Sequence, residues 1–317
     1  MKTRKLGRSG LDVSSVGLGC NNFGGRVNAA ETKAVVHQAL DSGVTYFDTA
    51  DTYGRRGGGS AGLSEEYLGA ALGARRKDIV LGSKFANPMD DEGKLQGGSR
   101  RYVMSAVEAS LKRLKTDWID LYQMHQADPS TPIEETLRAL DDLVKQGKVR
   151  YIGCSNTPAW RVVDACWTAK AHGLPSFISW QNEYSLLNRG VEAEVVPAAL
   201  AHGVGLLPYY PLASGLLTGK YKPGTPPPAG SRFAQPSRFE ARFQTDATTK
   251  KVEALRTFAE ARGHTLLELA MSWLGAQPSV GSVIAGATSA DQVKANVAAA
   301  SWTFSAEELA EIDKITR

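Results

Sequence analysis

Residues 121–155 read LYQMHQADPSTPIEETLRALDDLVKQGKVRYIGCS, and this stretch contains the unit that decides the predicted fold. Leu121–His125 and Tyr151–Ser155 are short, largely apolar runs, as expected of strands that are buried in a sheet. Ile133–Lys145 lies between them and carries apolar residues at every third or fourth position, which predicts a helix with one buried face. A strand, a helix and a second strand in this order are typical of parallel strands joined by a crossover helix.

The same alternation runs through most of the chain. The other runs that resemble buried strands are Ser15–Gly19, Thr45–Thr49, Ile79–Lys84, Ile178–Asn182, Gly205–Tyr209 and Ser282–Gly286. The other amphipathic stretches are Glu31–Asp41, Glu65–Leu72, Arg101–Leu114, Trp160–Ala171, Glu192–Ala201, Lys250–Ala261 and Leu266–Ala276. Eight strands that alternate with helices favour a closed (β/α)8 barrel, the TIM barrel, over an open doubly wound sheet. We therefore expect an α/β protein whose residues 1–317 form a single barrel domain.

Two segments depart from this alternation. Lys2–Val13 has a turn region between Gly7 and Gly10, which predicts a small N-terminal β-hairpin. Pro211–Thr248, after the seventh strand, is rich in proline and glycine and carries several basic residues. A loop of this length within a compact domain is usually functional, so we expect a lid over a binding site, with an insertion of no function as the alternative.

The composition excludes several classes of protein. Hydrophobic residues make up 42% and charged residues 22% of the 317 residues, which is ordinary for a soluble globular protein. The net charge of +4 is mild and the basic residues are scattered, so we expect no nucleic-acid partner. The three cysteines, Cys20, Cys154 and Cys166, lack metal-ligand spacing, so we expect no metal and a reducing compartment.

The N-terminus also bears on location. It is too polar for a signal peptide, and no stretch approaches the roughly 20 apolar residues of a membrane helix. We therefore expect a cytoplasmic protein with no membrane partner. A monomer is the default expectation, because no long apolar helix face is left over.

Four ionisable residues follow strands whose ends would open onto one face of a barrel. Asp48 ends one strand, Tyr53 follows it in the loop, Lys84 ends IVLGSK and His125 ends DLYQMH. Taken alone, each has an ordinary explanation: a turn cap, a loop aromatic, a solvated lysine and a packed histidine. Their shared position makes them a candidate active site.

Together, these residue types form a proton donor suited to carbonyl reduction. Tyrosine, with a pKa of about 10, holds its proton at neutral pH. A nearby Lys84 ammonium favours the phenolate, so we expect it to lower the pKa of Tyr53. Asp48 supplies the counter-charge that a buried Lys84 needs, and His125 can hydrogen-bond the substrate oxygen.

The sequence resembles the aldo-keto reductase superfamily along nearly its whole length, near the bacterial general aldo/keto reductases and the potassium-channel β subunits. The matching segments, in the family's order and spacing, are VGLGCNNFGG, YFDTADTYG, GSKF, DLYQMHQAD, GKVRYIGCSN, WQNEYSLL, YYPLASGLLTGK and GATSADQVKAN. The resemblance implies a (β/α)8 barrel that reduces small carbonyl substrates with a nicotinamide cofactor. It also implies a catalytic tetrad of Asp48, Tyr53, Lys84 and His125, with Tyr53 as the proton donor.

A barrel must hold a dinucleotide differently from a doubly wound domain, and the sequence has no Gly-x-Gly-x-x-Gly fingerprint. Tyr209 ends a strand and can stack on a nicotinamide ring, and the start of the helix after Gly286 is a natural phosphate site. The resemblance places the following residues at the cofactor: Gly19, Cys20, Asp48, Ser155, Asn156, Gln181, Tyr209, Tyr210, Pro211, Leu212, Ser214, Gly215, Lys220, Arg232, Gly286, Thr288, Gln292 and Asn296.

One departure from the family bears on the choice of cofactor. Many relatives carry Lys or Arg at positions matching Gly286, Thr288 or Gln292, where a base grips the 2′-phosphate, and this sequence has none of them. The subset that resembles the channel β subunits has similar small polar residues and still prefers NADPH. On this resemblance we expect NADP(H).

The residues expected at the substrate are Asn21, Phe23, Ala86 and Gln126. Relatives with bulky aromatic groups at the places of Asn21, Ala86 and Gln126 form a tight apolar slot, whereas here those places are small or polar. We therefore expect an open, fairly polar pocket that accepts many aldehydes. The alternative is a lid that rebuilds a narrow pocket.

Two other functions remain open. One is a nicotinamide-binding regulatory subunit like the channel β subunits, although those proteins carry Asn at the place of His125. The other is a barrel enzyme that forms a Schiff base through Lys84. The neighbouring Asp48 disfavours this chemistry, because an opposite charge keeps a lysine protonated.

Overall fold

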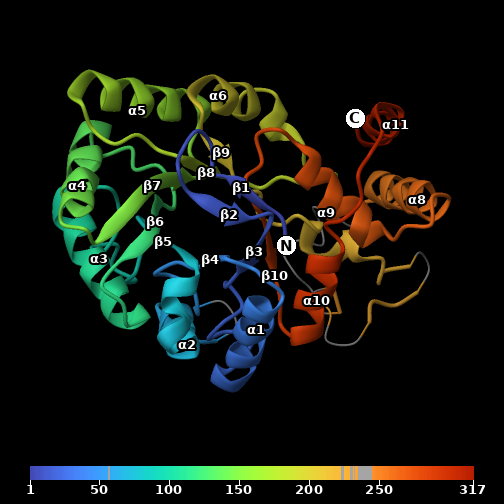
Figure 1. Ribbon diagram of the computed structural model, residues 1–317, viewed down its shortest axis with the longest axis horizontal. Helices are drawn as coiled ribbons and strands as arrows, with labels where there is room; N and C mark the ends of the chain where they lie inside the picture. Colours follow the sequence, from blue (N-terminus) through green and yellow to red (C-terminus); the bar gives the residue numbers. More distant parts are fainter. Residues whose placement is uncertain (56–57, 223–224, 229–230, 232, 235–244) are drawn as a thin grey trace.

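The structure is a computed structural model in which an eight-stranded parallel sheet is surrounded by helices (Figure 1). It describes residues 1–55, 58–222, 225–228, 231, 233–234 and 245–317. The strands follow the order β10-β3-β4-β5-β6-β7-β8-β9, so that each strand from β3 to β9 lies beside the next along the chain and β10 returns to β3. This is the strand order of a (β/α)8 barrel, and it confirms the predicted fold class.

The barrel strands are short, and their side chains are mostly buried. They are β3 (Val16–Gly19), β4 (Tyr46–Asp48), β5 (Val80–Phe85), β6 (Ile119–Met124), β7 (Val149–Ser155), β8 (Ser179–Gln181), β9 (Gly205–Leu206) and β10 (Val283–Gly286). Backbone hydrogen bonds also join the two edges of the ladder: Leu206 N donates to Ser279 O at 2.7 Å, and Gly281 N donates to Leu206 O at 2.9 Å. These bonds bring β9 against the segment that leads into β10.

The seventh barrel strand is shorter than predicted. The sequence predicts a strand over Gly205–Tyr209, whereas β9 ends at Leu206. Pro208 interrupts the ladder because it has no N–H to donate. The chain nevertheless continues in the same direction, since Tyr209 N donates to Asn182 O at 3.0 Å.

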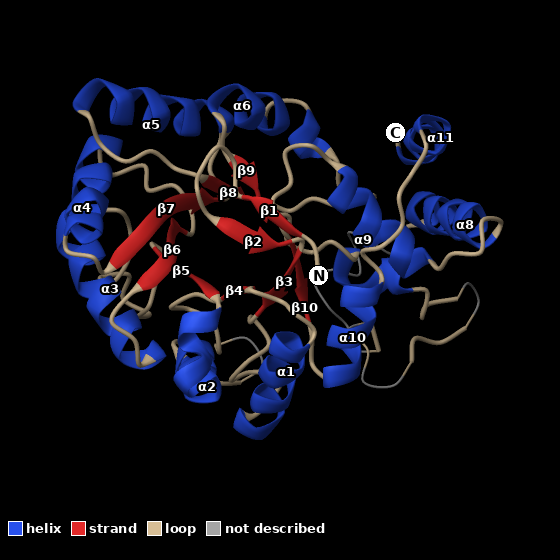
Figure 2. Cartoon of the chain, viewed as in Figure 1, coloured by secondary structure: helices blue, strands red, loops and turns tan. Residues whose placement is uncertain are grey.

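Helices cover the outside of the barrel (Figure 2). They are α1 (Ala29–Asp41), α2 (Leu63–Leu72), α3 (Arg100–Leu114), α4 (Ile133–Lys145), α5 (Ala159–His172), α6 (Val195–His202), α8 (Asp246–Glu260), α9 (Leu266–Ala276), α10 (Ala290–Ala298) and α11 (Ala306–Thr316). Leu137 and Leu140 of α4 are fully buried in the main core, as their spacing predicts. Within the described residues, no helix combines the length and the apolar character needed to cross a membrane.

The helix predicted over Glu192–Ala201 is divided in two. Gly190–Glu192 forms a separate 3₁₀ helix, η2, and α6 begins only at Val195. Glycine at residue 203 then ends α6 with a φ of 71°, a left-handed conformation that glycine adopts without a steric penalty.

The predicted N-terminal hairpin is present, and it closes one end of the barrel. β1 (Thr3–Lys5) and β2 (Asp12–Ser14) pair antiparallel and lie across the opening of the barrel in the view of Figure 1. Leu6 and Val13 are fully buried and pack against Tyr46, Leu121 and Leu207 inside the barrel. Because these contacts lie toward the amino ends of the strands, the carboxyl ends are left for a functional site.

The loop after the seventh strand is described in part. It begins with the 3₁₀ helix η3 (Ala213–Thr218), whose Ser214 and Gly215 have φ angles of 61° and 102°. α8 begins at Asp246, inside the stretch predicted as a loop, because the Thr245 side chain accepts from Thr248 N and caps the helix. The predicted cofactor residue Arg232 lies outside the described residues.

Candidate active site

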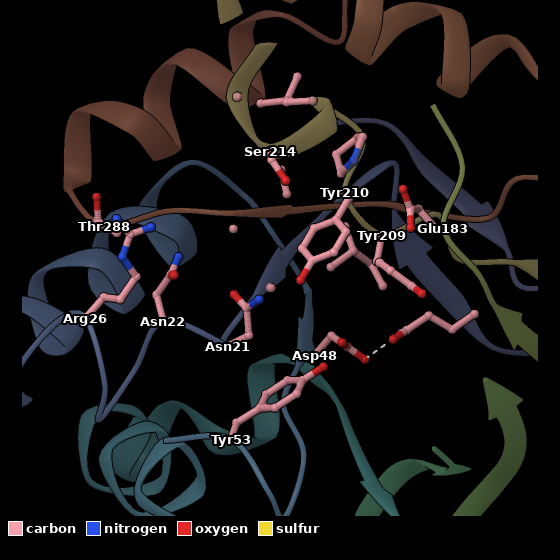
Figure 3. Close-up of a pocket in the computed structure, with 18 of the residues that line it drawn as sticks. Asn21, Asn22, Arg26, Asp48, Tyr53, Glu183, Tyr209, Tyr210, Ser214 and Thr288 are labelled. Atoms are coloured by element: carbon pink, nitrogen blue, oxygen red, sulfur yellow. Dashed lines mark hydrogen bonds between the residues drawn. The ribbon is translucent and has the colours of Figure 1, made fainter. Parts of the chain in front are cut away.

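The carboxyl ends of the barrel strands surround a cavity of about 1190 Å³. In Figure 3, Asp48 and Tyr53 line one side of this cavity, and Tyr209 and Tyr210 line the opposite side. Thr288 marks one end of it. A barrel presents its strand ends on one face, so residues that are far apart in the sequence meet here.

A buried ion pair lies beneath the cavity. The Lys84 Nζ atom is 2.6 Å from Asp48 Oδ2, and the two side chains are 0% and 3% exposed. Lys84 also donates to Thr49 O at 2.8 Å. Burial alone would lower the pKa of Lys84, but Asp48 and Tyr53 outweigh it, so its pKa is raised and the ammonium stays charged.

Asp48 is held by several donors besides Lys84. Its second oxygen, Oδ1, accepts from Gln181 Nε2 at 2.9 Å, from Tyr46 Oη at 3.0 Å and from Gln123 Nε2 at 3.3 Å. Tyr46 lies on the same strand two residues earlier, and Gln123 comes from β6. The carboxylate is therefore fixed in position by groups from several strands.

Tyr53 extends this network into the cavity. Lys84 Nζ donates to Tyr53 Oη at 3.4 Å and lies 4.9 Å from the centre of its ring. Burial raises the pKa of Tyr53; Lys84 opposes this effect, and Asp48 adds to it. Lys84 thus lowers the pKa of Tyr53 as expected, but the net shift is upward, because the loss of water around the phenol has the larger effect.

His125 lies beside Tyr53. Their ring centres are 5.6 Å apart and the rings are nearly perpendicular, at 78°. The His125 backbone is fixed at both ends: its N–H donates to Phe85 O at 2.8 Å, and its carbonyl accepts from Asn156 Nδ2 at 3.1 Å. Asp48, Tyr53, Lys84 and His125 are thus brought together, and all but Lys84 line the cavity.

Comparison with known proteins identifies the family. The model of the aldo/keto reductase family matches residues 15–317. The chain belongs to the aldo/keto reductase family. Aldo/keto reductases are oxidoreductases that act on carbonyl groups with a nicotinamide cofactor, and the chain is therefore an enzyme of this class.

The similar proteins include potassium channel β subunits and a bacterial reductase. A probable voltage-gated potassium channel subunit beta of Arabidopsis thaliana is 38% identical over 308 residues, which cover 94% of this chain and 91% of the relative. An L-glyceraldehyde 3-phosphate reductase of Escherichia coli (strain K12) is 35% identical over 325 residues, covering 99% and 92%. The protein Tas of the same strain is 34% identical over 340 residues, covering 99% and 97%.

The residues predicted around a nicotinamide form a connected group in this aldo/keto reductase. Tyr209 Oη donates to Asn156 Oδ1 at 2.8 Å, and Asn156 Nδ2 donates to Ser155 Oγ at 3.0 Å. Ser155 Oγ in turn donates to Gln181 O at 2.9 Å. All four residues line the cavity, and their hydrogen bonds hold flat and polar groups in fixed directions.

Backbone strain is concentrated at this end of the barrel. Most of the non-glycine residues with positive φ in the described chain follow barrel strands: Ala86, Asn156, Tyr210, Ala213 and Ser214. Such conformations cost about 1–3 kcal/mol each and persist where the surrounding structure enforces them. Their position supports a functional role for these loops.

The other predicted cofactor residues lie along the rest of the cavity. Those that line it are Gly19, Tyr210, Pro211, Leu212, Ser214, Gly215, Lys220, Gly286, Thr288, Gln292 and Asn296. An added Cβ at Gly215 would lie 3.3 Å from Lys220 Nζ, which places this ammonium against η3. The predicted substrate contacts Asn21 and Gln126 also line the cavity.

Besides Lys84, three predicted residues within the described chain do not line the cavity. Cys20 is fully buried, and its thiol donates to Leu18 O at 3.6 Å within the core. Phe23 is fully buried in the main core. Ala86 is 2% exposed, and its positive φ of 88° turns the chain away after β5. The sequence pattern places these residues correctly at the carboxyl ends of the barrel strands, but it does not reveal which way each side chain points.

Several cavity residues were not predicted, including Asn22, Arg26, Arg55, Asn87 and Glu183. Each is adjacent to or within a few residues of a predicted site residue. Two basic residues could have been predicted from the sequence as cavity residues. Arg55 follows directly after the active-site motif, and Arg26 lies in the glycine-rich loop after the first barrel strand.

Proposed function

We propose that this protein catalyses the NADP(H)-dependent reduction of small aldehydes and ketones, with Tyr53 as the proton donor. The observation that carries the proposal is the position of Tyr53 Oη. It lies 3.4 Å from the Lys84 ammonium, which is itself 2.6 Å from Asp48, and it faces the large cavity. A phenol beside a charged ammonium can release its proton and leave a stabilised phenolate.

The cavity suits a nicotinamide dinucleotide. Different parts of the cavity carry different groups. The tetrad lies near Ser155, Asn156 and Gln181, which can bind a carboxamide, whereas Thr288 and Gln292 lie at the other end. The Lys220 ammonium lies along η3 between these parts and provides a cation for phosphates. When bound, the cofactor supplies the hydride that carbonyl reduction requires.

The chain's own residues then divide the remaining work. Tyr53 donates a proton to the carbonyl oxygen, and His125, whose ring lies 5.6 Å from that of Tyr53, binds the same oxygen. Lys84 stabilises the phenolate that forms, and Asp48 keeps Lys84 charged. Tyr46, Gln123 and the other donors to Asp48 keep this pair aligned.

The substrate side of the cavity is polar. Asn21, Thr52, Asn87 and Gln126 line it, and Arg55 lies at the same side. We propose small polar aldehydes as substrates. The similarity to the L-glyceraldehyde 3-phosphate reductase of Escherichia coli supports this class.

The test compares three proteins with NADPH and a panel of small aldehydes. We expect the wild type to oxidise NADPH steadily, and Tyr53→Phe to be slower by about a hundredfold or more, since this is the usual contribution of a positioned acid. Tyr67→Phe serves as the control, because Tyr67 lies outside the cavity and makes no side-chain hydrogen bond in the described structure. Equal turnover by Tyr53→Phe would refute the assignment of the proton donor.

A second candidate function is a nicotinamide-binding regulatory subunit. The identity of 38% to a probable potassium channel subunit beta favours it. The two functions differ in turnover: a purely regulatory subunit would bind NADPH tightly and leave every aldehyde of the panel unreduced. A Schiff-base enzyme is disfavoured, because the raised pKa of Lys84 leaves little of the neutral amine that such chemistry needs.

A further inference from the structure

The loop between β3 and α1 is built against the far end of the cavity. Asn22 Nδ2 donates to Ala287 O at 3.3 Å, which ties this loop to the segment between β10 and α10. An added Cβ at Gly286 would lie only 3.3 Å from Asn22 Nδ2, so the two segments are in close contact. Phe23 and Val27 anchor the loop in the core, with exposures of 0% and 4%.

Arg26 is the cation that this loop presents to the cavity. Its backbone is fixed because Arg26 N donates to Asn22 O at 2.9 Å. Its side chain lines the cavity, and Figure 3 shows the guanidinium directed toward the end marked by Thr288. Among the described residues, none forms an ion pair with Arg26.

This end of the cavity has no other cation in the described part of the chain. The side chains of Thr288, Gln292 and Asn296 also line this end of the cavity. Two backbone N–H groups here already donate hydrogen bonds within the protein. Thr288 N donates to Gln292 Oε1 at 2.9 Å, and Gln292 N donates to Ser289 Oγ at 3.3 Å. Among the described side chains at this end, the Arg26 guanidinium is the one that can pair with a doubly charged phosphate.

Lys220 serves a different part of the cavity. Its ammonium lies near Gly215, on η3, and Figure 3 shows Ser214 of η3 apart from Thr288. The two cations are thus separated along the cavity, as the pyrophosphate and the 2′-phosphate are separated along NADP(H). Arg26 lies between β3 and α1, in a different strand–helix loop from residues 286, 288 and 292.

We propose that Arg26 binds the adenosine 2′-phosphate and is the residue that makes this enzyme prefer NADP(H) to NAD(H). The inference rests on the proposed function, since it requires that a nicotinamide dinucleotide occupies the cavity. Guanidinium and phosphate form two parallel hydrogen bonds, and NAD(H) offers only a hydroxyl at the same position.

The experiment measures binding rather than turnover. Dissociation constants for NADP⁺, NAD⁺ and 2′,5′-ADP are measured by calorimetry for the wild type, Arg26→Gln and Arg26→Lys. We expect Arg26→Gln to bind NADP⁺ and 2′,5′-ADP about tenfold to a hundredfold more weakly, the usual range for a hydrogen bond to a charged group, and to bind NAD⁺ as the wild type does. Arg26→Lys retains part of the affinity, because it keeps the charge but loses the paired geometry.

The matched control is Arg101→Gln, an exposed arginine of α3 that lies outside the cavity and forms no ion pair within the described chain. Equal weakening of NADP⁺ and NAD⁺ by Arg26→Gln would place Arg26 at the pyrophosphate and overturn the inference. Unchanged binding of all three ligands would also overturn it, while leaving the proposed function intact. A wild type that binds neither dinucleotide would instead refute the proposed function.

Discussion

The Lys84 ammonium lies 2.6 Å from the Asp48 carboxylate, and both groups are almost completely removed from water. Asp48 ends β4 and Lys84 is the penultimate residue of the neighbouring strand β5, and the pairing of these strands aligns Asp48 with Gly82. A buried ion pair of this kind contributes little net stability, because desolvation offsets the attraction. Because the pair lies beneath Tyr53, we expect it to act mainly in the chemistry of the site.

Removing one member of this pair is expected to destabilise the protein strongly. Lys84→Met leaves Asp48 buried without its counter-charge, which costs about 3–5 kcal/mol of unfolding free energy. The double variant Asp48→Asn with Lys84→Met removes both charges and should recover much of that loss. Urea denaturation at neutral pH measures both values, and equal stability of the single and double variants would contradict the coupling.

The rate of carbonyl reduction should be insensitive to pH until alkaline conditions. The folded-state pKa of Tyr53 is raised, so the protonated donor is present throughout the neutral range and is lost only as pH rises through that value. We expect a rate that stays level to about pH 9 and declines beyond the ordinary tyrosine value of about 10. The profile is measured for the wild type and for His125→Gln, and a decline near neutral pH in both proteins would show that Lys84 dominates instead.

Asp128 should contribute stability that disappears in acid. Burial raises its pKa, but hydrogen bonds from Gly98 N, Ser130 and Thr131 outweigh burial and hold the pKa at about 2, below the ordinary 3.8. A lowered folded-state pKa gives stability that is present above the ordinary value and is lost as pH falls toward the folded one. After allowance for its partial exposure, we expect Asp128→Asn to cost about 1 kcal/mol at neutral pH.

Near pH 2, where Asp128 becomes protonated in the folded protein as well, Asp128→Asn should cost almost no unfolding free energy. Thermal unfolding of Asp128→Asn and of the wild type at neutral and acidic pH gives this comparison. A cost that is equal at both pH values would show that the hydrogen bonds act independently of the charge.

Arg189 should hold the C-terminal helix in place. Its guanidinium donates to Asp313 Oδ1 at 2.7 Å and to Thr316 Oγ1 at 2.6 Å, and two further bonds of 2.7 and 2.8 Å reach Glu192. Arg189→Lys keeps the charge but cannot form this fork, so we expect α11 to open more readily, by about 1–3 kcal/mol. Hydrogen exchange of the α11 amides measures the opening, and Arg317→Lys, at an exposed ion pair with the same Asp313, is the control.

The barrel and its elements follow from the sequence because their causes are local. The spacing of Leu137 and Leu140 in α4 and the apolar run of β6 report burial directly, since each periodicity matches one kind of element. Positions at strand ends, such as Asp48 and Lys84, are also local, and the fold class then implies that these ends share one face. The family resemblance adds the roles that remain to be tested.

Only the tertiary structure determined which way the side chains of the site loops point and how deeply the ionisable groups are buried. Cys20, Phe23 and Asn22 are neighbours in one loop, yet only Asn22 lines the cavity, because packing and not sequence order sets where each side chain points. The pKa of Tyr53 depends on burial, which raises it, and on Lys84, which lowers it, and the sequence does not reveal which effect is larger. Arg26 faces the Thr288 end because the loops after β3 and β10, which are far apart in the sequence, meet where these neighbouring strands end.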